Sequence, residues 1–201
     1  MKKLLGLALA CALLLTGCGA RGGDKGEELG DNTIRPLELT EEEAALLKLV
    51  GGLNSDYGTY QFKIGEGITG CDVEVLTWTD GQWKLTGGST VAVSGPSDQA
   101  RMGVVLGDEE IRINWQDGAS QISVTTSLGE LDRSNEAGCA WTWLNEGQAL
   151  TPGERTPIYL EVYQKEGVEE VNIGGVSKGF TDAERLDSYD RAYAVAVTLE
   201  A

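Results

Sequence analysis

Hydrophobic and polar positions change their pattern twice along the chain. An uncharged, mostly apolar run occupies residues 4–15, directly after Met1-Lys2-Lys3. Apolar residues recur at helical spacing between residues 45 and 53, and beyond residue 57 they alternate with polar residues in short runs. Alternation with a period of two is typical of half-buried strands, whereas apolar residues three and four apart are typical of helices. The pattern predicts a leader, one helix and an all-β domain.

The alternating part predicts a mainly antiparallel β-sandwich over residues 55–201, of immunoglobulin-like or jelly-roll-like type. Its short runs are separated by Gly and Asp-Gly turns, which is the pattern of sandwiches and barrels. The candidate strands are residues 60–64, 71–79, 82–86, 90–94, 101–106, 110–116, 119–127, 139–144, 158–164, 171–176 and 193–199.

The first predicted hairpin contains a conflict between its two ends. With Asp80-Gly81 as a two-residue turn, Trp78 lies opposite Trp83. The apolar residues upstream on the same strand then point to the opposite face. Either a β-bulge near Val75-Leu76 brings both sets inward, or the Trp78/Trp83 pair stays partly exposed. An exposed pair would offer a stacking platform to sugar rings or an apolar patch to a protein.

A second hairpin is predicted around Asp117-Gly118, which pairs Trp115 with Ser120. This arrangement separates an apolar face from a polar face, as in a half-buried antiparallel ribbon. The apolar face is Ile111, Ile113, Trp115, Ile122 and Val124, and the polar face is Arg112, Asn114, Gln116, Gln121 and Ser123.

A capping sequence opens the helical segment, which is predicted over residues 40–52. In Thr40-Glu41-Glu42-Glu43 the Thr40 hydroxyl can accept the backbone amide three residues on, while the Glu43 carboxylate reaches back. Gly51-Gly52 supplies the stop. The apolar stripe of this helix is expected to pack against the sandwich, with a protein-docking helix as the alternative. The stripe comprises Ala45, Leu46, Leu49, Val50 and Leu53.

The chain begins with the features of an exported and lipidated protein. Two lysines precede the apolar run, which is too short for a permanent membrane span and suited to a secretion signal. Leu15-Thr16-Gly17-Cys18 then resembles the lipobox of bacterial lipoprotein precursors. The resemblance implies a signal peptide over residues 1–17, cleavage before Cys18, and a diacylglyceryl group on the Cys18 thiol. Membrane lipid is therefore an expected partner, and the extracytoplasmic face of the cell membrane is the expected location.

The segment after the modified cysteine is expected to be a flexible tether, so that residues 18–39 link the anchor to the domain. Between Gly19 and Asn32 the composition is Gly, Asp, Glu, Lys and Arg, with almost nothing to bury. A coil of about 20 residues spans about 25 Å. The folded part is therefore expected to stand off the lipid surface.

The composition narrows the available chemistry. The chain has 201 residues, with 16 Lys and Arg, 32 Asp and Glu and no His, so its net charge is −16. The absence of His excludes Ser-His-Asp and Cys-His nucleophile pairs, His-ligated zinc and an imidazole base. The negative charge argues against nucleic acid as a partner. Carboxylate pairs of the glycosidase type arise by chance among so many acids, and we predict neither a catalytic residue nor a cofactor.

Two cysteines remain in the expected mature domain, Cys71 and Cys139. Outside the membrane two such cysteines predict a disulfide, with two buried free thiols as the alternative. The order Cys71, Trp83, Cys139 also resembles the strand cysteine, core tryptophan and partner cysteine of immunoglobulin domains. The tyrosine of that pattern, expected two residues before the second cysteine, is Ala137 here. We therefore predict a sandwich without assigning the family.

Acidic residues are densest near the C-terminus, which raises the question of a Ca²⁺ site. A short surface helix explains them better, because Thr181 with Glu184 forms another capping sequence and Asp187 can pair with Arg191 one turn on. No alternating Asp and Asn loop of the EF-hand type is present. The calcium candidates are Asp182, Glu184, Asp187 and Asp190.

Three classes of function remain. A non-catalytic surface module that binds a protein or a glycan is favoured by the tether, by a β-scaffold whose loops are free to vary, and by the five tryptophans. A structural or assembly accessory of the cell envelope is the first alternative, and a carboxylate-dependent glycosidase-type enzyme is the second. The solvent exposure of Trp78 and Trp83 decides whether a ligand platform exists there.

Overall fold

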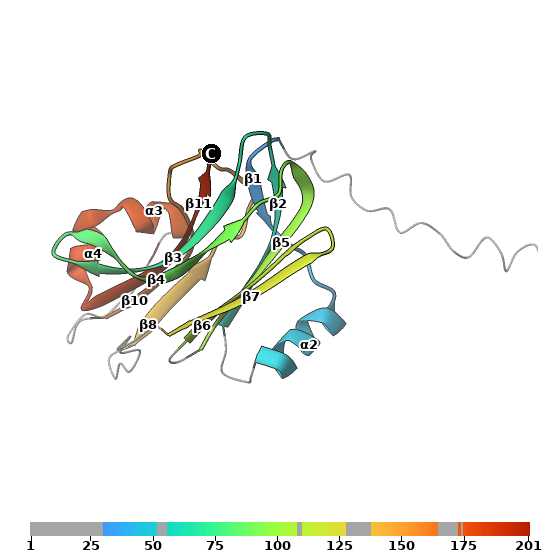
Figure 1. The fold of residues 1–201 in the computed structure, drawn as a ribbon. Helices are drawn as coiled ribbons and strands as arrows, with labels where there is room; N and C mark the ends of the chain where they lie inside the picture. The colour runs from blue at the N-terminus through green and yellow to red at the C-terminus, as the bar shows by residue number, and fades with distance from the viewer. Residues whose placement is uncertain (1–29, 52–55, 108–109, 128–137, 165–172, 174) are drawn as a thin grey trace, which may run out of the picture.

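The computed structural model describes residues 30–51, 56–107, 110–127, 138–164, 173 and 175–201. Two antiparallel sheets pack face to face, and two short helices cover the outer face of one of them (Figure 1). The predicted all-β, mainly antiparallel sandwich is therefore confirmed. The predicted signal peptide and Cys18 lie outside the described residues. In the described part, no helix has both the length and the apolar character needed to cross a membrane.

The first sheet, here called sheet A, has six strands in the order β7-β6-β5-β2-β1-β9. Neighbouring strands pair antiparallel throughout. The strands are β1 (Thr33–Pro36), β2 (Asp56–Ile64), β5 (Ser97–Leu106), β6 (Glu110–Asp117), β7 (Ser120–Ser127) and β9 (Gln148–Ala149).

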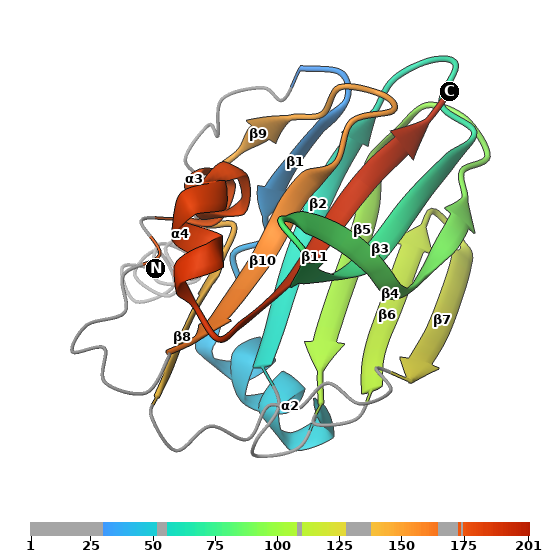
Figure 2. The same ribbon diagram turned by 90° about the vertical axis from the view of Figure 1, so that its left-hand side faces the viewer.

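The second sheet, sheet B, has five strands in the order β4-β3-β11-β10-β8, also antiparallel. Helices α3 (Val176–Thr181) and α4 (Ala183–Ser188) lie on its outer face (Figure 2). Half of the predicted strand over residues 171–176 lies outside the described residues; Ile173 and Gly175 belong to no strand, and Val176 opens α3. The strands are β3 (Gly70–Thr79), β4 (Gln82–Ala92), β8 (Cys139–Trp143), β10 (Thr156–Tyr163) and β11 (Arg191–Glu200).

The core lies between the two sheets. Phe62 and Trp115 of sheet A are buried with their ring centroids 5.0 Å apart. The buried Tyr60 hydroxyl crosses to sheet B and donates to the carbonyl oxygen of Ile158 at 3.1 Å. The Tyr60 bond satisfies a polar group that would otherwise be stranded in the core. A single continuous apolar core therefore joins the two sheets.

The first hairpin has the predicted turn. Asp80 and Gly81 both have positive φ, at 55° and 72°, and Trp78 pairs with Trp83. The register also shifts between Val75 and Leu76, where a bulge was predicted.

The expected consequence of that bulge, with both apolar sets pointing inward, is wrong. The extra residue, Thr86, lies in β4, and β3 keeps an unbroken register with β11. Val75 therefore faces sheet A, whereas Leu76 faces the α3–α4 side, and both are buried because sheet B is covered on both faces.

The second hairpin turns one residue later than predicted. Asp117 pairs with Ser120 and Trp115 pairs with Ile122, so Gly118 and Ala119 form the turn. The Asp117 carboxylate accepts a 2.6 Å hydrogen bond from the Ser97 hydroxyl of β5, which keeps Asp117 in the strand. Pairings move by two positions in total, so the predicted apolar and polar faces are unchanged.

Helix α2 (Glu41–Gly51) begins with the predicted capping bonds. The Thr40 backbone N–H donates to the Glu43 carboxylate at 2.8 Å, and the Glu43 N–H donates to the Thr40 hydroxyl at 3.3 Å. The predicted packing of the apolar stripe is wrong, because Leu46 and Leu49 are 60% and 78% exposed. The helix lies to one side of sheet A at one end of the molecule (Figure 1).

The predicted tether extends too far along the chain. Residues 33–36 form β1 inside sheet A, where Ile34 is fully buried and pairs with Phe62. Leu37 continues this contact, because its backbone N–H donates to the Thr59 carbonyl at 2.8 Å. The sandwich therefore includes residues before the helix, and α2 is an insertion between its first two strands.

Candidate functional site

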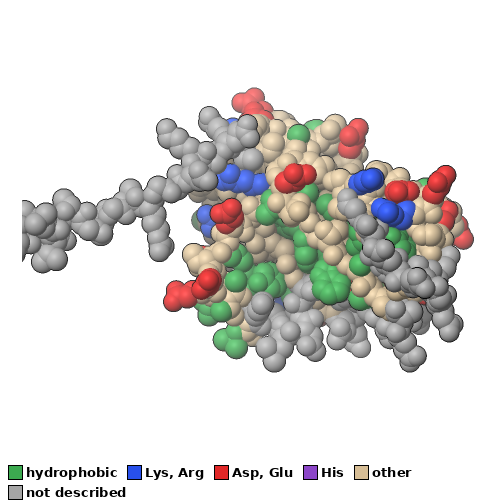
Figure 3. Space-filling model, turned by 180° about the vertical axis from the view of Figure 1, so that it is seen from behind, with side chains coloured by type: hydrophobic (Ala, Val, Ile, Leu, Met, Phe, Trp, Pro, Cys, Tyr) green, Lys and Arg blue, Asp and Glu red, His purple; other side chains and the backbone are tan. Residues whose placement is uncertain are grey.

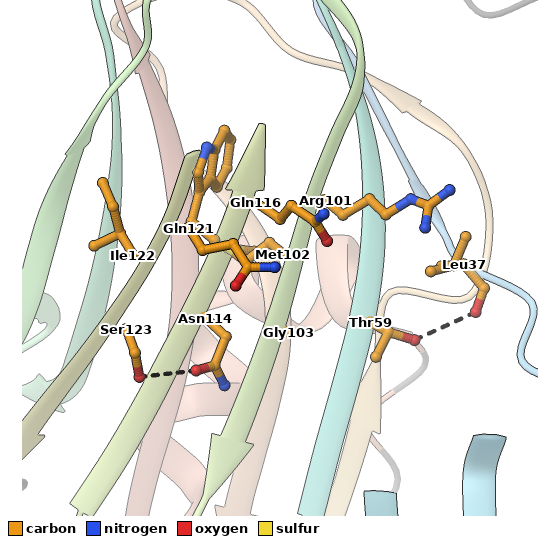
Figure 4. Close-up of a pocket in the computed structure, with 11 residues that line it drawn as sticks. Leu37, Thr59, Arg101, Met102, Gly103, Asn114, Gln116, Gln121, Ile122 and Ser123 are labelled. Atoms are coloured by element: carbon orange, nitrogen blue, oxygen red, sulfur yellow. Dashed lines mark hydrogen bonds between the residues drawn. The ribbon is translucent and has the colours of Figure 1, made fainter. Parts of the chain in front are cut away.

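The outer face of sheet A carries a groove of about 600 Å³, here called the sheet A groove (Figure 4). Its floor follows from strand alternation, which points every second side chain away from the core. The register places Gly103 beside Thr59 and Asn114, while Arg101 lies beside Gln116. The lining residues are Leu37, Thr59, Arg101, Met102, Gly103, Asn114, Trp115, Gln116, Gln121, Ile122 and Ser123.

Gly103 opens the middle of this groove. A Cβ at this position would meet no atom within 4 Å. Figure 4 shows the bare strand at Gly103 between the side chains of Asn114 and Thr59. A side chain here would fill the space, so the depth of the groove depends on glycine.

Polar side chains of the groove have free hydrogen-bonding capacity. The Ser123 hydroxyl donates to Asn114 Oδ1 at 2.8 Å, which leaves the Asn114 NH₂ group available. Within the described part of the chain, the side chains of Gln116 and Gln121 make no hydrogen bond. Each primary amide offers two donors and one acceptor oxygen. The groove can therefore form several hydrogen bonds with a ligand.

The charge in the groove differs from that of the chain as a whole. None of the lining residues is Asp or Glu, although the chain has 32 of them against 16 Lys and Arg. Acidic side chains are scattered over the rear surface of the molecule, around exposed hydrophobic groups (Figure 3). In the groove the charged group is Arg101, which is exposed. The described lining residues therefore carry one positive charge and no negative charge, in a chain whose net charge is −16.

One carboxylate lies within electrostatic reach of this arginine. The hydrogen bonds from Thr40 lower the pKa of Glu43, and Arg101 adds a smaller lowering effect. The Glu43 carboxylate already accepts the Thr40 backbone N–H at 2.8 Å and hydroxyl at 2.9 Å. It therefore serves the start of α2 and leaves the Arg101 guanidinium open.

The predicted tryptophan platform is occupied by the protein itself. Trp78 and Trp83 are half-buried with ring centroids 5.2 Å apart, and Trp83 stacks on Phe180 of α3 at 4.9 Å. The Trp83 indole N–H donates to the Phe180 carbonyl at 2.9 Å, and the Trp78 indole N–H donates to Asp187 of α4 at 2.7 Å. The pair holds α3 and α4 on sheet B, and the structure does not support a free stacking surface there.

The predicted disulfide is wrong, because Cys71 and Cys139 are not joined by a disulfide. In the strand register Cys71 lies opposite Leu199, at one end of β11. Cys139 lies opposite Tyr163 of β10, which in turn lies opposite Arg191 at the other end of β11. Those two β11 positions are eight residues apart, about 26 Å along the strand. The alternative of two buried thiols is half right, since Cys71 is buried and Cys139 is exposed.

The acidic C-terminal segment forms the predicted short helix but no calcium site. Asp182, and not Thr181, caps α4 by accepting the Arg185 backbone N–H at 3.1 Å. Asp187 accepts the Trp78 indole, and Arg191 pairs with Asp190 at 3.2 Å. Across the described residues, no three His, Cys, Asp or Glu side chains gather as metal ligands. Of the four candidates, Asp182 caps α4, Asp187 binds the Trp78 indole, Asp190 pairs with Arg191, and Glu184 is exposed in the first turn of α4.

The groove residues were partly visible in the sequence. The polar face predicted for the second hairpin contains Asn114, Gln116, Gln121 and Ser123, which line the groove. The contribution of Arg101 from β5 was missed, because it depends on which strand lies beside the hairpin. The sequence did contain a signal for the groove itself. Amide side chains on the outward face of a strand do not contribute to the core of a sandwich, so their presence on that face indicates a candidate polar site.

Comparison of the chain with protein-family models, with curated protein sequences and with solved structures finds no match.

Proposed function

We propose that this chain is a bacterial surface lipoprotein whose sandwich binds a glycan, without catalysis, in the sheet A groove. The observation that carries the proposal is the set of unengaged polar groups on an exposed sheet face. Gln116, Gln121 and the Asn114 NH₂ group lie on adjacent strands in paired register. Sugar hydroxyls both donate and accept hydrogen bonds, which matches the mixed donors and acceptors of amides.

The groove also has the apolar contacts that a sugar ring needs. Leu37 lies at one side of the groove, while the 39% exposed Ile122 points to the other face of β7 and borders the groove at its edge (Figure 4). Ligand sites combine apolar walls with a few placed polar groups. The aliphatic side chain of Leu37 suits the C–H face of a sugar, while the open floor at Gly103 gives room for its ring.

A binding role is favoured over hydrolysis by the composition of the groove. Glycosidases that use two carboxylates place them on either side of the scissile bond. Among the described residues that line this groove, none carries a carboxylate. The amides and the guanidinium can hold a sugar but supply no general acid of that type.

Anchoring is supported by the leader and by the lipobox ending at Cys18. Two acyl chains hold a protein on a membrane essentially permanently, whereas one does so only marginally. In this proposal the modified Cys18 keeps the sandwich on the extracytoplasmic face. A Cys18→Ala variant should leave the detergent-rich phase on phase partitioning, and retention in that phase would contradict the anchor.

A second role, as an accessory that docks another envelope protein, is favoured by α2. Its Leu46 and Leu49 are exposed on a well-capped helix. Adjacent apolar side chains on one surface helix are typical of protein contacts. A Leu46→Ser/Leu49→Ser variant would lose such a partner and keep glycan binding.

The groove is tested with the mature lipoprotein in detergent and an immobilised panel of neutral and acidic glycans. Gly103→Trp should abolish binding, because the new side chain fills open space without a clash. Thr125→Trp is the matched control, since it adds an aromatic to an exposed β7 position outside the groove lining. Equal binding by both variants, or no binding by the native protein, would contradict the proposal.

A further inference from the structure

Arg101 has no carboxylate at ion-pair distance among the described residues, unlike Arg112, Lys63 and Arg155. On the same face of sheet A, Arg112 pairs with Glu110 at 3.0 Å and Lys63 pairs with Asp31 at 3.4 Å. On sheet B, Arg155 binds Glu74 through two 2.8 Å hydrogen bonds. In the described part of the chain, no carboxylate lies within ion-pair distance of Arg101.

The neighbours of Arg101 also leave its guanidinium open. Gln61, its partner on β2, is already engaged, because it accepts from Arg35 at 3.0 Å and donates to the Asp98 carbonyl at 3.1 Å. Gln116, its partner on β6, has no bond to a described side chain. The groove therefore presents a fork of N–H donors next to an unengaged amide.

We infer that the ligand of the sheet A groove is an acidic glycan, whose sugar carboxylate is held by Arg101 and whose hydroxyls are held by Gln116, Gln121 and Asn114. This inference rests on the proposed glycan-binding function. A guanidinium matches a carboxylate with two parallel hydrogen bonds, which are stronger than neutral ones. No acidic residue is among the described lining residues, and the nearby Glu43 carboxylate is already hydrogen-bonded to Thr40.

The layout of the groove orients such a ligand. Figure 4 shows the guanidinium of Arg101 toward Leu37, with Gln116 and Gln121 nearer the middle and the Ser123–Asn114 pair on the opposite side. The carboxylate end of the sugar would therefore lie toward Leu37. Its hydroxyl-bearing part would extend across β5 toward β6 and β7.

The net charge of −16 limits how acidic the ligand can be. Charges beyond about 8 Å are largely screened at physiological salt, but a dense polyanion brings many charges inside that range. A single cationic side chain in the groove lining suits one carboxylate per sugar repeat. The expected class is a uronic-acid oligosaccharide, and a heavily sulfated chain is disfavoured.

The test compares the binding of oligogalacturonate and oligoglucuronate with that of their methyl esters, which keep the same sugars and lose the charge. For the mature lipoprotein in detergent, titration calorimetry should give at least about tenfold tighter binding of one acid than of its ester, because a charged hydrogen bond exceeds a neutral one by about this factor. Arg101→Gln should remove the difference and keep ester binding. Arg112→Gln is the control and should preserve the difference between acid and ester, because the native Arg112 is already paired with Glu110.

Each result separates the inference from the proposed function. Equal affinity for acid and ester, or an acid preference that persists in Arg101→Gln, would overturn the acidic ligand while leaving a glycan site. Absence of binding to every neutral and acidic oligosaccharide would overturn both. Binding of an acidic hexapeptide in preference to the sugars would assign the carboxylate to a protein ligand and overturn the inference. Unchanged thermal unfolding of both arginine variants checks that the fold is intact.

Discussion

The outer faces of the two sheets differ in their exposure to solvent. Sheet B is covered on both sides, so that every residue of β10 is buried and β11 is buried from Ala192 to Leu199. Sheet A is covered on one side, and its outer strands β6 and β7 keep polar side chains in solvent. A face sealed by the chain's own helices holds the fold together. A face left open is where a ligand can bind.

Helices α3 and α4 cover the outer face of sheet B, and with it the aromatic pair that the sequence analysis considered as a binding site. The indole N–H groups of Trp78 and Trp83 donate hydrogen bonds to α4 and α3, respectively, and the Trp83 ring stacks on Phe180 of α3. Over the groove, by contrast, side-chain donors are left without partners. This free hydrogen-bonding capacity is the reason for proposing the ligand surface at the groove and not at the tryptophan pair.

The largest expected contrast between sealed and open positions is in thiol reactivity. Burial raises the pKa of the Cys71 thiol to about 12, with Asp72 and Glu200 adding to the rise, whereas Cys139 is exposed. A raised pKa keeps the thiol protonated at pH 8, so Cys71 should react about 10³-fold more slowly than an ordinary cysteine. In the proposed mature form, which lacks Cys11 and carries an acylated Cys18, a thiol reagent should count one reactive group in the native protein and two after denaturation. Rapid labelling of both without denaturant would contradict the sealed core.

The next contrast is in stability. Leu160→Ala removes a fully buried side chain beneath α3, and should lower the free energy of unfolding by about 2–5 kcal/mol. Ile122→Ala at the rim of the groove should cost less than about 1 kcal/mol, because this side chain is already 39% exposed. Urea titration of both variants measures the difference. Similar losses would show that the face of sheet A is packed as tightly as that of sheet B.

A smaller loss is expected where the hairpin meets α4. Trp78→Phe keeps the aromatic contact with Trp83 but deletes the 2.7 Å hydrogen bond to Asp187. The loss of one such bond should cost about 1 kcal/mol. Asp187→Ala should cost a similar amount, and the double variant should cost little more than either one alone. Fully additive losses would mean that the two side chains act independently.

The sequence carried the local parts of this fold. Thr40 with Glu43 predicts the start of α2, and Asp80-Gly81 predicts a turn in which both residues adopt positive φ. These features depend on a few adjacent residues, so the local sequence is enough to predict them. The predicted position of the turn at Asp117-Gly118 is wrong. The Asp117 carboxylate accepts a hydrogen bond from Ser97, which lies twenty residues away on another strand.

The arrangement of layers depends on contacts between distant residues. Trp83 meets Phe180 across 97 positions of the chain, and no local pattern around either residue indicates the other. The packing of α3 on sheet B made an anchor of an aromatic pair whose exposure the sequence analysis had left open. The groove was only half visible for the same reason, since Arg101 and Gly103 reach it through strand order.

The Gly103→Ala variant should change the free energy of unfolding least among these variants and should still weaken glycan binding clearly. Gly103→Ala replaces a mid-strand glycine where a Cβ meets nothing, so it should raise the free energy of unfolding by about 0.5 kcal/mol. The same methyl group narrows the floor of the groove and should weaken glycan binding. Gly88→Ala in sheet B is the matched control, because its φ of 151° and a clash with the Val73 carbonyl should destabilise the protein by about 1–3 kcal/mol. Calorimetry of unfolding and of binding measures both quantities. If Gly103→Ala left binding unchanged, the ligand would not enter the groove at its centre, and the open face would have to act through its rim.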